Sequence, residues 1–330
     1  MKQCFVLSLA VIAAFLGLCT LVNVQTVHAE EVKPAKILLF TRSQGHEHEP
    51  ARWVDNGTGT GRILNAYFRA YDKNIEIVET QDGRVFDGDI DQYDAFVFYT
   101  SGNLLGGVDA NHEKIQRNAA FHPMTEAGLR KMIAAIRAGK GFVGIHAATD
   151  THCGIMEDGV DIFTRLVGAR FTGHGPDQYA KLTVVQPTTT ILRRYNLRLG
   201  RSVYAEQTVV QPTAIPFLKG KGKQFTFFDE WYGMNHFNTD MHVVLIQETE
   251  GMRGRDYERP PYPMTWLRKE GEGRAAYTSV GHNNRYLNEI AWLVSDLIEW
   301  SIGRFNADTT PNIETVTPRF REMPPPRQQQ

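Results

Sequence analysis

Cysteine is scarce in this chain of 330 residues, which has only three. Cys4 and Cys19 fall in an apolar N-terminal stretch, so a chain cleaved after that stretch keeps Cys153 alone and forms no internal disulfide. Cys153 also lies several residues beyond the end of the nearest predicted strand, which argues against a cysteine nucleophile. The mature fold is therefore expected to be stabilised by its core without covalent links.

Basic runs and several common catalytic motifs are also missing. The chain has 36 basic and 37 acidic residues, and without Lys2 the counts become 35 and 37. No stripe of Lys or Arg is present, so nucleic acid is not expected as a partner. The GxSxG motif of serine hydrolases is absent. The glycine-rich run 57–61 does not directly follow a predicted strand, which excludes a standard dinucleotide or phosphate loop.

Residues 1–29 have the composition of a secretory signal peptide. Lys2 gives a basic start, residues 5–22 are almost wholly apolar, and residues 27–29 offer small side chains at the −3 and −1 positions of a cleavage site. We expect cleavage after Ala29, a periplasmic or secreted mature protein, and no membrane span after cleavage. The alternative is an uncleaved membrane anchor, because the apolar run is about long enough to cross a bilayer.

The first half of the mature chain alternates between strand and helix patterns. Predicted helices at 61–71 and 125–139 have apolar residues on one face, and short apolar runs predict strands at 37–40, 75–80, 93–102 and 141–147. This alternation with short links predicts an α/β fold, an open and mostly parallel sheet with helices on both faces.

The second half is richer in strand patterns. Strands are expected within the runs 180–187, 224–232, 242–249, 263–269 and 274–281, and an amphipathic helix over 287–302 closes the body. We predict one domain over 30–305, with a possible insertion at 188–216. The tail 306–330 is rich in Pro and Gln and is predicted to be disordered.

Polar side chains follow four of the predicted strands where each strand ends. Because ligands bind at the carboxyl ends of parallel strands, we expect one pocket lined by these groups. They are His46 and His48 after the first strand, Ser101 after the third, His146 and Asp150 after the fourth, and His282 after the last.

His146 is the sharpest of these candidates, since it directly follows a buried apolar strand; a satisfied core histidine is the alternative. His46 and His48 have a spacing that suits a metal clamp or two sugar hydroxyls, although an exposed polar loop explains them as well. Asp150 could orient His146, bind substrate or cap a helix. His174, in a glycine-rich turn, is a further candidate.

The run 227–237 places two carboxylates, Asp229 and Glu230, beside Trp231 and Tyr232. A carboxylate next to an aromatic ring suits a sugar, because the carboxylate binds hydroxyls or moves a proton and the ring covers the apolar face. A strand with a half-buried tryptophan is the alternative interpretation.

Taken together, the segments KILLFTRSQGHEH, GFVGIHAATDT, RLVGARFTGH, DEWY and PMTWLRKEGEGRAAYTSVGH resemble the ThuA-like (trehalose utilisation) family over roughly 36–303. The resemblance implies a class I glutamine amidotransferase-like fold, of flavodoxin-like type, and a role in carbohydrate catabolism, often beside dehydrogenases that make 3-keto glycosides. His146 stands about where that superfamily usually has its nucleophile, so amidotransferase chemistry is not implied. The implied pocket residues are His46, His48, His146, Asp150, His174, Glu230 and His282.

These observations predict an exported enzyme that hydrolyses or isomerises a 3-keto glycoside or disaccharide. A keto group acidifies the neighbouring C–H, so a positioned base can start the reaction. We assign catalysis to His146, Glu230 and Asp150, and binding of a small carbohydrate to His46, His48, Ser101, His174, Trp231, Tyr232 and His282. A divalent metal such as zinc, on candidate ligands His46, His48 and His146, would polarise the carbonyl.

Two other functions fit the same residues. One is a non-catalytic carbohydrate-binding protein on the same fold, which would need Trp231 and Tyr232 but not His146. The other is a metal-dependent hydrolase of a non-sugar amide or ester. No oligomeric state follows from the sequence.

Overall fold

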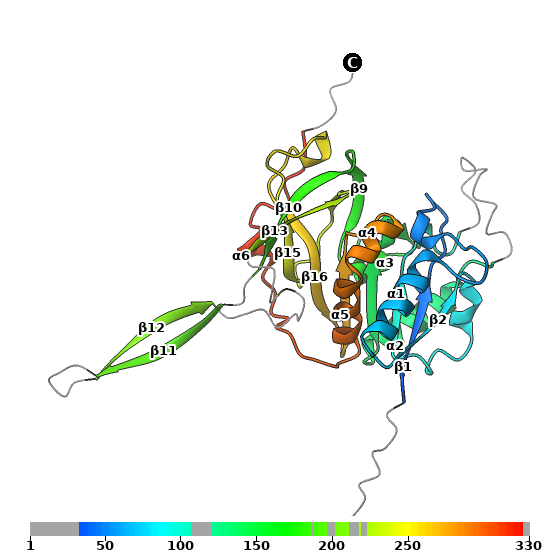
Figure 1. Ribbon diagram of the computed structural model, residues 1–330, viewed down its shortest axis with the longest axis horizontal. Helices are drawn as coiled ribbons and strands as arrows, with labels where there is room; N and C mark the ends of the chain where they lie inside the picture. The colour runs from blue at the N-terminus through cyan, green and yellow to red at the C-terminus, as the bar shows by residue number, and fades with distance from the viewer. Residues whose placement is uncertain are drawn as a thin grey trace, which may run out of the picture. The chain divides into compact units, whose positions relative to one another are not determined.

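The computed structural model describes residues 33–106, 121–185, 188–196, 202–210, 218 and 223–325 (Figure 1). The predicted signal peptide, 1–29, lies outside these residues. Within the described ranges, no helix combines the length and the apolar character that a bilayer span requires.

A nine-stranded sheet forms the centre of the fold, in the order β13-β10-β15-β16-β17-β5-β3-β1-β2. Five adjacent strands are parallel: β2 (Ile75–Thr80), β1 (Ala35–Phe40), β3 (Ala95–Phe98), β5 (Gly141–Ile145) and β17 (Gly273–Thr278). The remaining four pair antiparallel: β16 (Tyr262–Glu270), β15 (His242–Gln247), β10 (Gln178–Val184) and β13 (Gln224–Asp229). The prediction of an α/β fold is confirmed, and the sheet is mixed because the β-rich second half extends it.

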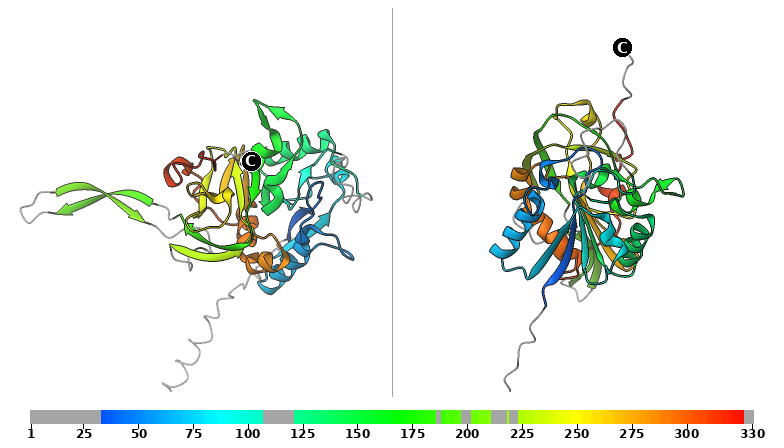
Figure 2. Two further views of the ribbon diagram at one scale, coloured as in Figure 1. Left: turned by 90° about the horizontal axis from the view of Figure 1, so that it is seen from above. Right: turned by 90° about the vertical axis from the view of Figure 1, so that its right-hand side faces the viewer.

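Helices cover both faces of the parallel strands, as Figure 2 shows. The side chains of β1 alternate between the faces: Ile37 and Leu39 belong to one apolar cluster, Leu38 and Phe40 to the other. The first cluster includes α1 (Gly59–Ala70), α4 (Asn284–Glu289) and α5 (Ala291–Ser301). The second includes α2 (Glu126–Arg137) and α3 (Ile162–Val167). The inner strands β1, β3 and β5 are thus buried on both sides, which explains their continuous apolar runs, whereas the edge strand β2 is only partly buried.

Short elements complete the described chain. Small sheets pair β4 (Gly102–Asn103) with β6 (Thr151–His152), β7 (Met156–Glu157) with β8 (Val160–Asp161), and β9 (Arg170–His174) with β14 (Tyr232–Asn235). The 3-10 helices are η1 (Glu49–Ala51), η2 (Gly83–Asp87), η4 (His146–Asp150) and η6 (Arg255–Tyr257). Inside the predicted insertion, β11 (Thr188–Asn196) and β12 (Ser202–Val210) pair antiparallel as a two-stranded sheet.

The prediction of a disordered tail is wrong for residues 306–325. This segment contains α6 (Ile313–Val316), and Ile313 and Phe320 are buried in the core. Its backbone is also held: the Asn312 side chain accepts a hydrogen bond from the Val243 N–H at 2.7 Å. Ile313 and Phe320 thus attach the tail to the core, although most of its residues are exposed or only partly buried. Residues 326–330 lie outside the described chain.

Candidate active site

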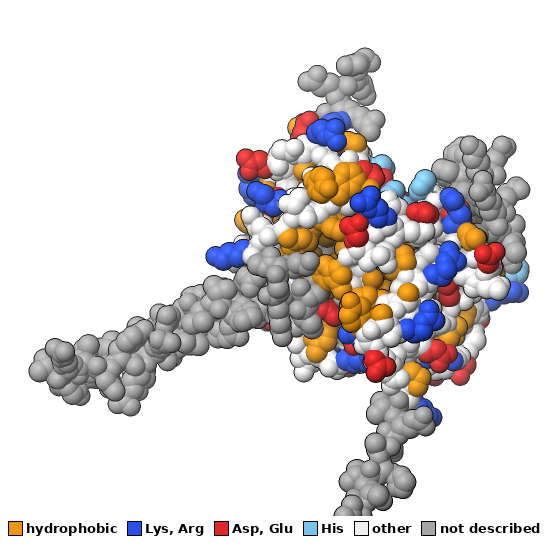
Figure 3. Space-filling model, in the orientation of Figure 1, with side chains coloured by type: hydrophobic (Ala, Val, Ile, Leu, Met, Phe, Trp, Pro, Cys, Tyr) orange, Lys and Arg blue, Asp and Glu red, His pale blue; other side chains and the backbone are white. Residues whose placement is uncertain are grey.

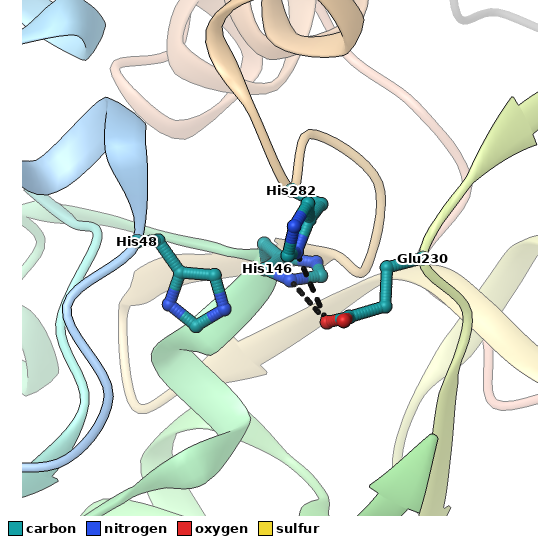
Figure 4. Close-up of side chains that lie close together, drawn as sticks. All are labelled: His48, His146, Glu230 and His282. Carbon is teal, nitrogen blue, oxygen red and sulfur yellow. Dashed lines mark ion pairs between the residues drawn. The ribbon is translucent and has the colours of Figure 1, made fainter. Parts of the chain in front are cut away.

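Three histidines and one glutamate meet at the carboxyl edge of the sheet (Figure 4). His48, His146, His282 and Glu230 each offer one ligand atom, and these atoms lie within 4.8 Å of one another. The three histidines follow β1, β5 and β17, whose carboxyl ends meet at this edge, and Glu230 follows β13. The structure therefore brings together three of the four predicted strand ends.

Glu230 reaches this cluster because the sheet curves. In the sheet order, four strands lie between β13 and β5. In a flat sheet, the axes of these two strands would therefore be about 24 Å apart. Yet Oε2 of Glu230 lies 3.5 Å from Nε2 of His146. The antiparallel half must therefore curve back toward the carboxyl ends of the parallel strands. Without this curvature Glu230 could not reach the histidines.

His146 occupies a sharp bend at the tip of β5. Its φ of 42° is in the left-handed region, which a residue with a side chain rarely adopts and which often marks a functional site. The Tyr277 hydroxyl donates to its carbonyl oxygen at 2.8 Å and helps to hold this bend. The ring is fully buried, and its Nδ1 lies 2.6 Å from the carbonyl oxygen of Ser279. Because a carbonyl only accepts, Nδ1 donates and the lone pair of the neutral ring is on Nε2.

That Nε2 atom and Nδ1 of His282 both face Oε2 of Glu230, at 3.5 and 3.0 Å. Both nitrogens are buried, and neither makes a hydrogen bond of acceptable geometry. Neighbouring ligands of a tetrahedral zinc ion, at 2.0–2.1 Å from the metal, are separated by about 3.3 Å. The orphaned nitrogens and the carboxylate thus have the chemistry and spacing of cation ligands.

The pKa values of His48, His146 and Glu230 suit the same interpretation. Burial, together with the neighbouring histidines, lowers the pKa of His48 to about 2, and burial lowers that of His146, so both rings are neutral donors of a lone pair. Burial alone raises the pKa of Glu230, but the close approach of His146 and His282 outweighs it and leaves the pKa lowered. For His282, burial lowers the pKa, and the interaction with Glu230 outweighs it and leaves the pKa raised, so this ring gives up a proton less readily than the other two.

His174 joins the cluster from the solvent side. Its Nδ1 lies 3.1 Å from Oε1 of Glu230, the oxygen that does not face His146 or His282. The His174 side chain is 45% exposed, whereas Glu230 is 8% exposed. Histidine side chains reach the surface at the upper edge of the molecule in Figure 3. His174 therefore connects a buried carboxylate to water.

Tyr232 lies next to two of the clustered histidines and is not an exposed platform. Its hydroxyl is 3.1 Å from Nε2 of His48, and its ring centroid is 4.1 Å from that of His146. The side chain is buried. Tyr232 is placed to orient two histidines rather than to cover a sugar.

Three other predicted site residues have different environments. Trp231 is fully buried and its indole N–H donates to the Gln178 carbonyl at 2.8 Å, so its prediction as a sugar platform is wrong: the ring faces the core. His46 is exposed and is not one of the four clustered groups, although its ring lies 4.8 Å from that of His48. Ser101 is buried and donates to the His46 carbonyl at 2.7 Å, which gives it a structural role in that loop.

Asp150 ends η4 and is not part of the four-residue cluster. Burial raises its pKa to about 6, and the charges of Arg170 and His174 oppose that rise. It lies at the periphery of the site and shares His174 with Glu230 as an electrostatic neighbour.

Sequence reasoning missed Tyr99 and Tyr277, two buried groups that hold the site's backbone. It named Asp229 beside Glu230 but gave it no role of its own, although the carboxylate of Asp229 accepts from the Gly281 N–H. Asp229 is the last residue of β13 and Glu230 follows it, so strand alternation does not show that the two side chains serve the site from different sides.

The fold and the site define an α/β protein with a histidine–carboxylate centre at the carboxyl edge of its sheet. The sequence profile of the ThuA family, described as trehalose utilisation, matches residues 36–293, so the chain belongs to this family. Among curated proteins, none matches this sequence closely enough to count as a relative.

Two crystal structures share the fold. A ThuA-like protein from Bacteroides uniformis is 15% identical with a TM-score of 0.53, over 86% of this chain and 98% of the other. One from Parabacteroides merdae is 14% identical with a TM-score of 0.54, over 84% and 94%. At this identity the likeness concerns the fold alone.

Proposed function

We propose that this protein is a metal-assisted acid/base enzyme of carbohydrate metabolism. The observation that carries the proposal is the pair of buried ring nitrogens of His146 and His282, which converge on one carboxylate oxygen of Glu230 and make no hydrogen bond of acceptable geometry. A buried polar atom without a hydrogen bond is costly, so its retention points to a ligand that satisfies it.

His48, His146, His282 and Glu230 would hold the cation, which replaces the expected set of His46, His48 and His146. Three imidazoles and a carboxylate are ligands that zinc accepts. A cation bound there supplies Lewis acidity toward a carbonyl oxygen. Tyr232 fixes the ring of His48 through its hydroxyl, in the way that outer partners orient ligating histidines.

Glu230 and His174 are the best placed groups for proton transfer. The lowered pKa of Glu230 keeps its carboxylate ionised at neutral pH, so Oε1 is free of a proton, although the same shift makes the carboxylate a weaker base than an ordinary glutamate. Oε1 of Glu230 faces Nδ1 of His174, which also lies 2.9 Å from the carbonyl oxygen of Gly175 and therefore carries the proton of the neutral ring. The half-exposed ring can thus donate this proton to the carboxylate and take another from water at Nε2. His146 is fully buried and therefore suits the role of a ligand rather than that of the base.

The description of the family as trehalose utilisation supports a glycoside substrate. For a 3-keto glycoside, the base removes the acidified proton beside the carbonyl, and the electron pair moves onto the carbonyl oxygen. Elimination or enolisation can follow without attack at the anomeric carbon. Hydrolysis and isomerisation of such a sugar both start with this step.

The binding-protein alternative has less support. It requires Trp231 and Tyr232 as an accessible sugar platform, and both side chains are buried. A cysteine mechanism is also disfavoured, because burial raises the pKa of the Cys153 thiol to about 11. The class I glutamine amidotransferase-like assignment stays a prediction of fold and not of chemistry.

Export is part of the proposal and rests on residues 1–29. Sequencing the N-terminus of the protein purified from its own envelope or medium tests it directly. A mature chain that begins at Glu30 supports cleavage after Ala29, whereas a chain that keeps the apolar run would instead favour the anchor.

Elemental analysis of the purified protein, before and after zinc or manganese is supplied, tests the metal. We expect one equivalent of metal, lost in His146→Ala and in His282→Ala and kept in the control His46→Ala. Turnover of 3-keto glycosides should vanish in the two metal-free variants and in Glu230→Gln. Absence of metal under every condition, or full turnover in Glu230→Gln, would contradict the proposal.

A further inference from the structure

Asp229 joins the two chain segments that carry Glu230 and His282. Its side chain is fully buried. One carboxylate oxygen, Oδ1, accepts from the backbone N–H of Glu230 at 2.9 Å and from that of His282 at 3.2 Å. The other, Oδ2, accepts from the N–H of Gly281 at 2.6 Å. A single oxygen atom thus fixes the backbones of two site residues that are far apart in sequence.

The opposite side of the same loop is held by Tyr99. Its hydroxyl lies 2.9 Å from the carbonyl oxygen of Gly281 and 3.2 Å from that of His282. Gly281 has a φ of 110°, which a side chain would strain. The backbone N–H groups of this turn therefore donate to Asp229, and its backbone carbonyl groups accept from Tyr99. Both sides of the turn are held, so the backbone of His282 has little freedom to move.

We infer that Asp229 is a positioning residue that sets the distance between Glu230 and His282, 3.0 Å from Oε2 to Nδ1. The inference rests on the proposed function, because it concerns the geometry of the proposed ligand set. It explains why a carboxylate occupies a fully buried position, where an unpaired charge is costly. Asp229 touches no substrate or cation in this role.

Asp229→Asn is the informative change, because an amide keeps the size and loses one acceptor. If its oxygen replaces Oδ1, its NH₂ group faces the N–H of Gly281, and two donors repel. The loop must then shift, and His282 shifts with it.

Asp161 provides a matched control. Its carboxylate also accepts from several backbone N–H groups, including those of Gly154 at 2.7 Å and Phe163 at 3.0 Å, and it joins a loop to the start of α3. None of its hydrogen-bond partners is a residue of the four-residue cluster. Asp161→Asn thus measures what the loss of such a carboxylate does to stability alone.

Titration of the full mature chain with cobalt(II) ion, followed in the visible spectrum, tests the role. We expect Asp229→Asn to bind cobalt about 10–100-fold more weakly, the range for groups that orient metal ligands, with an altered spectrum. Asp161→Asn should bind as the wild type does, even if its melting temperature falls as much. Wild-type affinity and an unaltered spectrum in Asp229→Asn would overturn the inference.

A second variant and a second measurement cover the other outcomes. If Asp229→Asn does not fold, Tyr99→Phe removes the hydroxyl on the other side of the loop and should weaken cobalt binding in the same direction. If the wild type binds no cobalt, the metal proposal fails. The His282 ring resonances of the metal-free protein then decide: a shift in Asp229→Asn but not in Asp161→Asn supports the positioning role, and no shift overturns it.

Discussion

Nε2 of His146 and Oε2 of Glu230 lie 3.5 Å apart, although four strands separate β5 from β13 in the sheet. The parallel half supplies the histidines and the antiparallel half supplies the carboxylate. The extension of the sheet is therefore part of the site and not an appendage to it. Variants that perturb either half can change activity without touching the cluster.

Trp231 should contribute to stability and not to sugar binding. Trp231→Phe leaves the Gln178 carbonyl without its indole donor, so the free energy of unfolding should fall by about 1–3 kcal/mol. The KM for the sugar should not change. Met156→Ala, at an apolar side chain that is 60% exposed, is the control and should change stability by less than about 0.5 kcal/mol. Urea unfolding and KM measured on each variant check this. A raised KM in Trp231→Phe at unchanged stability would restore the platform interpretation.

Asp150 should make stability depend on pH. Its pKa is raised by burial to about 6, from about 3.9 in an unfolded chain, so the folded state holds the proton more tightly. The stability that this proton contributes is complete below about pH 4 and is lost as the pH rises through 6. Asp150→Asn cannot ionise and should become more stable than the wild type across this window, by about 1–2 kcal/mol at pH 7 after allowance for partial exposure.

Urea unfolding at a series of pH values from 4 to 7 measures this difference. The exposed Asp91→Asn serves as the control and should parallel the wild type. A difference between Asp150→Asn and the wild type that stays constant from pH 4 to 7 would show that Asp150 ionises normally.

Tyr232→Phe should weaken metal binding while it leaves the fold intact. The variant keeps the ring against His146 and removes the hydroxyl that lies 3.1 Å from Nε2 of His48. We expect about a 10–100-fold loss of metal affinity and about 1 kcal/mol of stability. Thr317→Val, at a buried hydroxyl that donates to the Ile313 carbonyl at 2.9 Å, also loses one hydrogen bond to the backbone and should match only the stability change. Equal metal affinity in the two variants would show that the Tyr232 hydroxyl does not orient a metal ligand.

His174→Ala should slow turnover without loss of metal. His174 is outside the four-residue cluster, and its contact is with Oε1 of Glu230. If it passes a proton, kcat should fall by about 10²-fold, with metal content unchanged. The exposed His236→Ala is the control, and its kcat should equal that of the wild type. Loss of metal in His174→Ala would instead make His174 a ligand.

The sequence indicates the parallel half and three of the clustered histidines for one reason. Apolar runs buried on both faces mark β1 and β5, and strand ends of one sheet must share an edge. That rule identifies His48, His146 and His282 without any knowledge of distance. The same rule also selects His46, which is not in the cluster. The sequence of an extended loop does not show whether His46 or His48 points into the site.

Neither the curvature of the sheet nor the direction in which the Trp231 side chain points could be predicted from the sequence. Glu230 was found through its neighbours and not its position, because the coiling of the sheet depends on packing between distant strands. Trp231 follows the end of β13 at a bend, where the alternation of a strand no longer tells the inner from the outer side. The prediction of a disordered tail was wrong for a related reason. Ile313 and Phe320 are the apolar residues that bury in the core, and two residues are too few to form a periodic pattern.

The cluster draws on loops that follow both the first strand of the sheet and the last in chain order, β1 and β17. A partly synthesised or half-folded chain cannot assemble it, so a cation would be captured only after the whole domain has closed. Once bound, it would link the loops that follow β1 and β17 and would oppose any local unfolding that separates these loops. At a free metal concentration 100 times its Kd, the gain is about 2.7 kcal/mol. Metal supply would then determine not only activity but also how long the protein survives proteases.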